Sequence, residues 1–230
     1  MKRFLGLLLL NLLVVSLPGQ TGRDYFNYKQ GYSYLYNVIN PNDTNINTIS
    51  LIKILQYEVV CDSVWHDGSF YYVRLIYSFY YDYGNTIEKN DYPEIITYKI
   101  NNDSVIIKEK IVRKRLTAGN VKIIEMPGND TTSEWQSVKE REMISYLNKY
   151  NASFAGELEV KGRKYKNVLV VTRKEYLYDS DSEENFPGLL NITEKCYYAP
   201  NTGLIKKEYF DAENNFIGNK SYELKEIFVD

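Results

Sequence analysis

Apolar and polar side chains alternate along most of this chain with a period close to two residues. Tyr32, Tyr34, Tyr36 and Val38 share one side of the first segment that follows this pattern. The alternation is typical of a β-strand, because successive side chains of a strand point to opposite faces. The segment Ile49–Val60 is apolar on both sides, which predicts a longer strand covered on both faces.

Turn motifs separate the predicted strands. Asp67-Gly68 is typical of a two-residue hairpin loop, and Asn101–Asp103 and Lys161-Gly162 indicate two further turns. The segment 133–150 is ambiguous, because it fits either a short helix beginning at Ser133 or an irregular strand. The other strands are predicted at 70–81, 95–100, 105–110, 121–126, 154–160, 165–178, 192–198, 204–210 and 222–228.

No repeat of fixed period and no linker rich in proline or glycine divides the chain. We therefore predict one antiparallel β domain over residues 23–230, with at most one or two short helices. The remaining length, roughly 210 residues, is enough to bury a sizeable core.

The first residues show the three parts of a secretory signal peptide. Lys2 and Arg3 supply positive charge, an apolar run extends from Phe4 to Leu17, and small or turn-forming residues follow at 18–22. The apolar run is shorter than the about 20 residues that a bilayer span needs. We therefore expect an export signal and not a membrane anchor.

The predicted signal peptide covers residues 1–22, with cleavage after Gly19 or Gly22. Both glycines offer the small side chain that a signal peptidase accepts. No cysteine stands directly after the apolar run, where a lipoprotein signal would place one, and no later segment is long and apolar enough to cross a membrane. The sequence thus predicts an exported protein, periplasmic or extracellular, with no membrane span after cleavage.

Charge argues against two classes of partner. The 28 basic and 30 acidic residues give a formal net charge of −2, too small to gather nucleic acid or an anionic membrane. Tyrosine occurs 23 times. Its amphipathic ring suits a half-buried strand surface, and a stripe of rings would also suit stacking against sugars.

The two cysteines, Cys61 and Cys196, leave two alternatives open. In an exported protein they are candidates for a disulfide, which would close a long loop. They are equally compatible with two separate buried thiols that pack as small apolar groups.

The sequence offers little catalytic chemistry. His66 is the single histidine, so a multi-histidine zinc site is excluded and a serine or cysteine triad would need this one residue as its base. Its place beside Asp67-Gly68 predicts an exposed turn. The acidic stretch 179–184 lacks the spacing of an EF-hand loop and is interpreted as a solvated loop.

Paired carboxylates can act together only when the fold brings them close. Glu94, Glu157 and Glu159 lie in or beside predicted strands, but nothing in the sequence distinguishes them. We name no catalytic residue, no metal ligand and no cofactor, and we expect that the protein is not an enzyme.

Two stretches resemble a group of exported bacterial β-sheet proteins. These often show an aromatic pair followed by Gly-x-x-Trp-x-Tyr, and here Tyr25-Phe26 precedes Gly31–Tyr36, with Tyr34 at the tryptophan position. Near the C-terminus the chain is similar in Tyr197–Lys206, a hairpin that ends in Gly-Leu-Ile-Lys, and in the strand before it, Gly162–Val168.

This resemblance implies a curved antiparallel sheet, like the half-barrel of LolA/LolB-type lipoprotein carriers, which hold acyl chains in a concave apolar face. It transfers no residue role, because the shared positions are glycines of turns and aromatic residues of the core. The first hypothesis is therefore a non-enzymatic envelope protein that binds an apolar or lipid-like amphipathic ligand on a curved sheet. The alternatives are a structural protein that binds a protein or glycan of the envelope, and a carboxylate-dependent hydrolase.

Overall fold

The computed structural model describes residues 21–40, 53–82, 86–127, 132–139, 144–179 and 188–229. Within these ranges strands dominate, and the helix is a single turn. The elements are α1 (Gly22–Tyr25), β1 (Tyr32–Val38), β2 (Lys53–Asp67), β3 (Phe70–Asp82), β4 (Ile87–Lys89), β5 (Glu94–Ile100), β6 (Ser104–Val112), β7 (Arg115–Glu125), β8 (Thr132–Lys139), β9 (Ile144–Phe154), β10 (Glu157–Val160), β11 (Arg163–Lys166), β12 (Leu169–Asp179), β13 (Leu189–Ala199), β14 (Gly203–Phe210) and β15 (Tyr222–Val229).

One large antiparallel sheet contains 13 of these strands, in the order β7-β6-β5-β3-β2-β1-β15-β14-β13-β12-β9-β8, with β4 beside β3. The strands β10 and β11 form a separate hairpin. The sheet is curved and does not close into a barrel. Over the described residues, the predicted class, a mainly β protein with a curved antiparallel sheet and at most one or two short helices, is therefore confirmed.

The hairpins follow from the turn residues. Asp67-Gly68 joins β2 to β3, and Gly68 adopts a φ of 58°, where a side chain would be strained. Lys161 and Gly162 both have positive φ between β10 and β11, as a tight hairpin requires. Gly156, with a φ of 71°, interrupts the strand predicted over 154–160, so that β9 ends before it and β10 begins after it.

In the ambiguous segment 133–150, the described residues 133–139 and 144–150 contain neither a helix nor an irregular strand. It forms β8 and β9, which pair in regular antiparallel register with Trp135 opposite Tyr150. The pairing of β9 with β12 along its whole length outweighs the loose helical pattern, because helix propensity is a weak preference that tertiary contacts override. The predicted strand 49–60 is described from Lys53, and it extends to Asp67.

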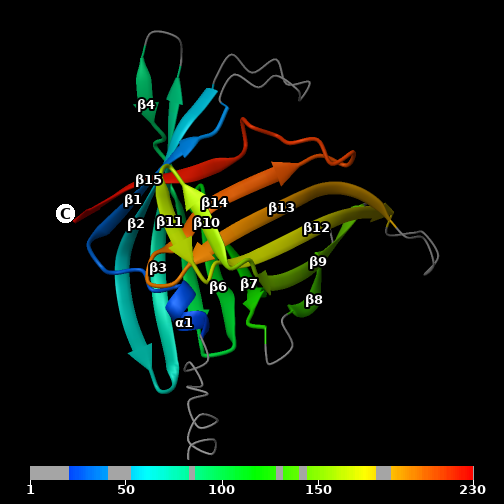
Figure 1. Ribbon diagram of the computed structural model, residues 1–230, viewed down its shortest axis with the longest axis horizontal. Coiled ribbons are helices and arrows are strands. Elements are labelled where there is room, and N and C mark those ends of the chain that lie inside the picture. Colours follow the sequence, from blue (N-terminus) through cyan, green and yellow to red (C-terminus); the bar gives the residue numbers. More distant parts are fainter. Residues whose placement is uncertain are drawn as a thin grey trace, which may run out of the picture.

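The sheet has two halves that meet along a narrow seam. The first half contains β1–β7 and β15, and the second contains β8, β9, β12, β13 and β14. Among the described residues only two pairs, Lys206–Glu223 and Lys207–Tyr222, join β14 to β15. Figure 1 shows β1–β3 running along one side of the molecule and β12–β14 running across the other.

The outer edges of the two halves also approach each other. The indole Nε1 of Trp135 on β8 donates a hydrogen bond to the carbonyl of Lys122 on β7, at 3.1 Å. The Ser133 hydroxyl donates to the carbonyl of Glu125, at 2.6 Å. Side chains therefore connect β7 and β8, where a barrel would have a backbone ladder.

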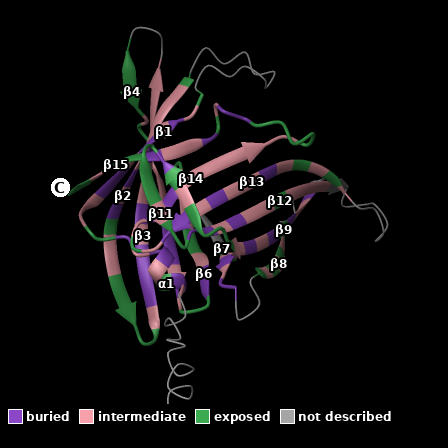
Figure 2. Ribbon diagram, viewed as in Figure 1, coloured by how far each residue is buried: buried purple, intermediate pink, exposed green. Residues whose placement is uncertain are grey.

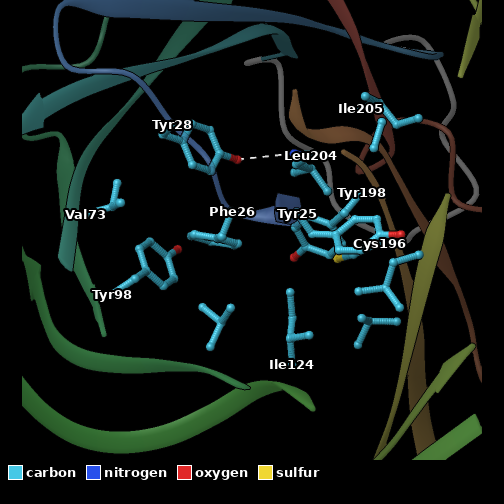
Figure 3. Packing of buried hydrophobic residues seen from close by; sticks show 14 of the residues in the cluster. Tyr25, Phe26, Tyr28, Val73, Tyr98, Ile124, Cys196, Tyr198, Leu204 and Ile205 are labelled. Carbon is cyan, nitrogen blue, oxygen red and sulfur yellow. Dashed lines mark hydrogen bonds between the residues drawn. The ribbon is translucent and has the colours of Figure 1, made fainter. Parts of the chain in front are cut away.

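The N-terminal segment Thr21–Tyr28, which we call the clamp, lies between the two halves. Tyr25, Phe26 and Tyr28 are buried almost completely. Figure 3 shows these rings between Val73 and Tyr98 on one side and a group from the second half on the other, which contains Cys196, Tyr198, Leu204 and Ile205. The Phe26 ring lies 4.7 Å from that of Tyr98 and 5.9 Å from that of Tyr198.

Hydrogen bonds fix the clamp to both halves. The Tyr71 hydroxyl on β3 donates to the Tyr28 carbonyl at 3.3 Å, while the Tyr28 hydroxyl accepts from the Leu204 amide on β14 at 3.3 Å. The Tyr25 hydroxyl donates to the Asn167 carbonyl at 2.7 Å. Figure 2 shows that buried residues gather around α1, whereas the tip of the β2–β3 hairpin is exposed. In the part of the chain described by the structure, no helix has the length and apolarity needed to cross a bilayer.

Candidate functional site

The face of the sheet that packs on the clamp, here called the inner face, changes character along each strand. On β12, Leu169 and Val171 are buried and point to the same face as Arg173. On β13, Tyr198 and Cys196 share a face with Glu194. The inner face therefore passes from an apolar end around the clamp to a charged end.

Four side chains from three neighbouring strands form the charged end, and we call these side chains the ionic cluster. They are Arg173 and Glu175 on β12, Glu194 on β13 and Lys207 on β14. Glu194 Oε2 accepts from Lys207 Nζ at 3.0 Å and from Arg173 Nη2 at 3.2 Å. Arg173 Nη1 donates to Glu175 Oε2 at 3.2 Å and to Asn148 Oδ1 at 3.1 Å. Register explains the grouping, because Arg173 stands directly opposite Glu194.

The cluster is largely, but not fully, withdrawn from water. Its four side chains retain between 15% and 24% of their exposure. The Nε of Arg173 is buried and has no hydrogen-bond partner among the described residues. A buried donor of this kind costs free energy unless a hydrogen-bond acceptor satisfies it.

At Glu194, the effect of neighbouring positive charges on the pKa outweighs the effect of burial. Burial alone raises the pKa of this carboxyl, but the charges of Lys207 and Arg173, with hydrogen bonds from Lys207 and Tyr209, hold its pKa at about 2. Burial lowers the pKa of Lys207, and the charge of Glu194 reverses this and raises it well above the ordinary value. Both groups are therefore ionised throughout the physiological range.

Aromatic rings flank the ionic cluster on both sides. Tyr222 stands opposite Lys207 in the ladder between β14 and β15, and its ring lies 4.5 Å from that of Tyr57. On the other side, Tyr150 stands opposite Arg173, and the Trp135 ring stacks on it at 5.0 Å and 5°. Tyr150 is buried, whereas Tyr57, Tyr222 and Trp135 are half-buried. Half-buried rings beside fixed charges suit a ligand with an apolar body and a polar group.

The candidate catalytic residues considered from the sequence lie apart from one another in the structure. His66 lies exposed at the end of β2, as predicted. Glu94 on β5 forms an ion pair with Lys110 at 2.7 Å, whereas Glu157 and Glu159 lie on β10, in the separate hairpin. The predicted acidic loop 179–184 falls almost entirely outside the described residues. Among the described residues, no group of three or more metal-binding side chains is close enough to hold an ion.

The two cysteines are free thiols, both buried, on β2 and β13. Burial, together with the charge of Asp62, raises the pKa of Cys61 to about 12. Burial also raises the pKa of Cys196 to about 12, against the opposing charge of Lys207. A thiol with so high a pKa is a poor nucleophile near neutral pH, so neither cysteine has the character of a catalytic residue.

The ionic cluster was missed in the sequence, although a weak pattern indicated it. Arg173 and Glu175 continue the alternation that begins with the apolar residues Leu169 and Val171, and Glu194 precedes Cys196 and Tyr198 in the same way. A charged side chain on the apolar side of a strand is unusual and indicates a buried ion pair. The identity of its partners required the three-strand register.

No family model and no curated protein matches this chain. Two solved structures are similar in fold. A "putative lipoprotein" from Parabacteroides distasonis has a TM-score of 0.49 and 14% identity, over 91% of this chain and 99% of the other. A "putative exported protein with YmcC-like fold" from Bacteroides fragilis has a TM-score of 0.44 and 11% identity, over 87% and 96% of the two chains.

At these identities the likeness concerns the course of the chain alone, and neither name assigns a role to this protein. The relation to LolA/LolB-type carriers stays a prediction.

Proposed function

We propose that this chain is an exported, non-enzymatic protein of the cell envelope that binds a small amphipathic ligand at the charged end of its inner face. The observation that carries the proposal is the ionic cluster, with its unpartnered Arg173 Nε and its flanking rings. The apolar body of the ligand would lie on the rings of Tyr57 and Tyr222. Its polar group would meet Arg173 and Lys207.

The position of the clamp favours a ligand of a different kind from the acyl chain that the resemblance implied. Tyr25, Phe26 and Tyr28 occupy the apolar end of the inner face and pack against both halves of the sheet. An acyl chain held in a purely apolar concave face would compete with these rings. A ligand with a substantial polar part fits the face better, because the side chains of the charged end retain 15–24% of their exposure.

Native mass spectrometry of the protein, purified from the cells that make it naturally, tests this proposal. We expect a noncovalent adduct that is released on collisional activation and recovered in an organic extract. A spectrum with the mass of the polypeptide alone, together with an extract equal to the blank, would contradict ligand binding.

Two neighbouring lysines on β14 provide a matched pair of variants. Lys207 belongs to the ionic cluster, whereas Lys206 points to the opposite face and pairs with Glu208 at 2.7 Å. We expect Lys207→Met to reduce ligand occupancy about tenfold, because one charge-assisted hydrogen bond is lost. Lys206→Met should leave occupancy unchanged, and equal losses in both variants would refute the assignment of the site.

The outer face supports a second candidate function, binding of a protein or glycan of the envelope. Trp65 on β2 stacks on Tyr72 at 5.2 Å and 6°, and 39% of Trp65 is exposed. Lys108 Nζ lies 5.2 Å from the centre of the Tyr72 ring. Pull-down from envelope extracts with wild type and Trp65→Ala would test it, since a partner lost in the variant requires the outer face.

A further inference from the structure

The residues at the start of the clamp are part of the folded structure, which bears on how the N-terminus is processed. The Thr21 amide and hydroxyl both donate to Asp24 Oδ2, at 2.7 and 3.0 Å. Thr21 is the N-cap residue of α1, and the Asp24 carboxylate satisfies its amide in the manner of a capping box. Without Thr21 the turn would lose the cap that orients Tyr25 and Phe26 into the core.

Gly22 is tied to the first half of the sheet. Its amide donates to the Asn102 carbonyl at 2.7 Å, in the turn between β5 and β6. A Cβ atom at this position would lie 2.9 Å from the Asn101 carbonyl oxygen, so the backbone approaches this turn as closely as only glycine allows. On the other side of α1, the Asp24 carbonyl accepts from the Asn201 amide at 2.8 Å.

These contacts discriminate between the two predicted processing sites. Cleavage after Gly22 would remove both Thr21 and Gly22, and it would place a new charged amine on Arg23 at the start of α1. Cleavage after Gly19 leaves the whole clamp in the mature chain. Both bonds follow a small residue, as a signal peptidase requires, so the difference lies in the product.

We infer that the export signal is removed by hydrolysis of the Gly19–Gln20 bond, which gives a carboxylate on Gly19 and a new amine on Gln20. The mature protein then begins just before the clamp and retains it. This inference rests on the proposed export. It assigns to Gly22 a structural role in the turn contact with Asn102, and not a role in recognition by the peptidase.

The intact mass and N-terminal sequence of the exported protein test the inference, after expression of the full chain in a host with a secretory pathway. We expect a chain that begins at Gln20, or its cyclised form lacking one ammonia. A chain that begins at Arg23 would overturn the inference but leave the proposed export standing. An unprocessed chain would overturn both.

Two leucine variants separate processing from folding. Pulse-labelling follows the conversion of precursor to mature chain and does not require the product to be stable. We expect Gly19→Leu to slow this conversion at least tenfold, because leucine is too large for the position before the cleaved bond. Gly22→Leu should convert at the wild-type rate, although its product is expected to fold poorly. The reverse pattern would overturn the inference.

Discussion

The two ends of the inner face belong to the same strands but are filled differently. At the apolar end, aromatic rings of the clamp complete the core and connect the two halves of the sheet. At the charged end, the four ion-paired side chains of the ionic cluster take the positions that apolar residues hold elsewhere on the same strands. The first end is closed by the protein itself, whereas the second retains an unpartnered donor.

Under the proposed function, the clamp end serves stability and the charged end serves binding. Buried rings contribute through the area they remove from water and through their packing, so the clamp end should dominate the free energy of unfolding. Buried ion pairs contribute less, because the desolvation of the charges offsets much of their attraction. The charged end is therefore expected to contribute less to the free energy of unfolding than the clamp end does.

The largest effect is expected from the clamp. Phe26→Ala should lower the free energy of unfolding by about 3–5 kcal/mol, because it leaves a cavity among the rings of Tyr28, Tyr98 and Tyr198. Urea unfolding followed by tyrosine fluorescence measures it. Phe228→Ala is the control, since 41% of that side chain is exposed and its loss should cost less than about 1 kcal/mol. Similar losses in both variants would show that the clamp does not join the two halves.

A smaller, pH-dependent effect is expected at the charged end. The pKa of Glu194 falls from an ordinary value of 4.5 to about 2 in the folded protein, so its contribution is complete above about pH 4.5 and is lost as the pH falls toward 2. By linkage this amounts to on the order of 3 kcal/mol. Glu194→Gln should remove that part of the acid transition and cost about 2–4 kcal/mol at neutral pH, since it leaves two cations under-compensated.

Glu208→Gln is the matched control for this measurement. Glu208 is as buried as Glu194 and also pairs with a lysine, but it lies on the outer face beside Tyr197. Thermal unfolding at several pH values from 2 to 7 should show the acid transition retained in Glu208→Gln and reduced in Glu194→Gln. An unchanged transition in Glu194→Gln would mean that the ionic cluster does not control acid stability.

The fold was largely predictable, because local chemistry determines it. The alternation of apolar and polar side chains predicted the strands. The turn residues Asp67-Gly68 and Lys161-Gly162 predicted two of the hairpins. The motif residues Tyr25, Phe26 and Gly31 are architectural, as the resemblance implied, since the two rings are buried and Gly31 has a φ of 76°. Helix α1 has four residues, too few for any periodicity to indicate it.

The ionic cluster could not be predicted from the sequence, because it depends on strand register and not on local chemistry. Arg173, Glu194 and Lys207 lie on three strands, and their meeting depends on the register of each pair. A shift of one residue would turn each charge to the outer face, where it would be an ordinary solvated side chain. The bulge between Tyr197 and Tyr198 contributes to this register, and nothing in the local sequence indicates it.

The smallest effect is expected where the edge strands meet beside the charged end. Trp135→Phe keeps a ring against Tyr150 but removes the hydrogen bond to the Lys122 carbonyl. It should cost about 1 kcal/mol, the net contribution of one hydrogen bond. Hydrogen exchange should locate the change in β7 and β8, with the clamp unaffected. Faster exchange at the clamp as well would show that the two ends of the inner face are coupled, so that ligand binding at one would also report on packing at the other.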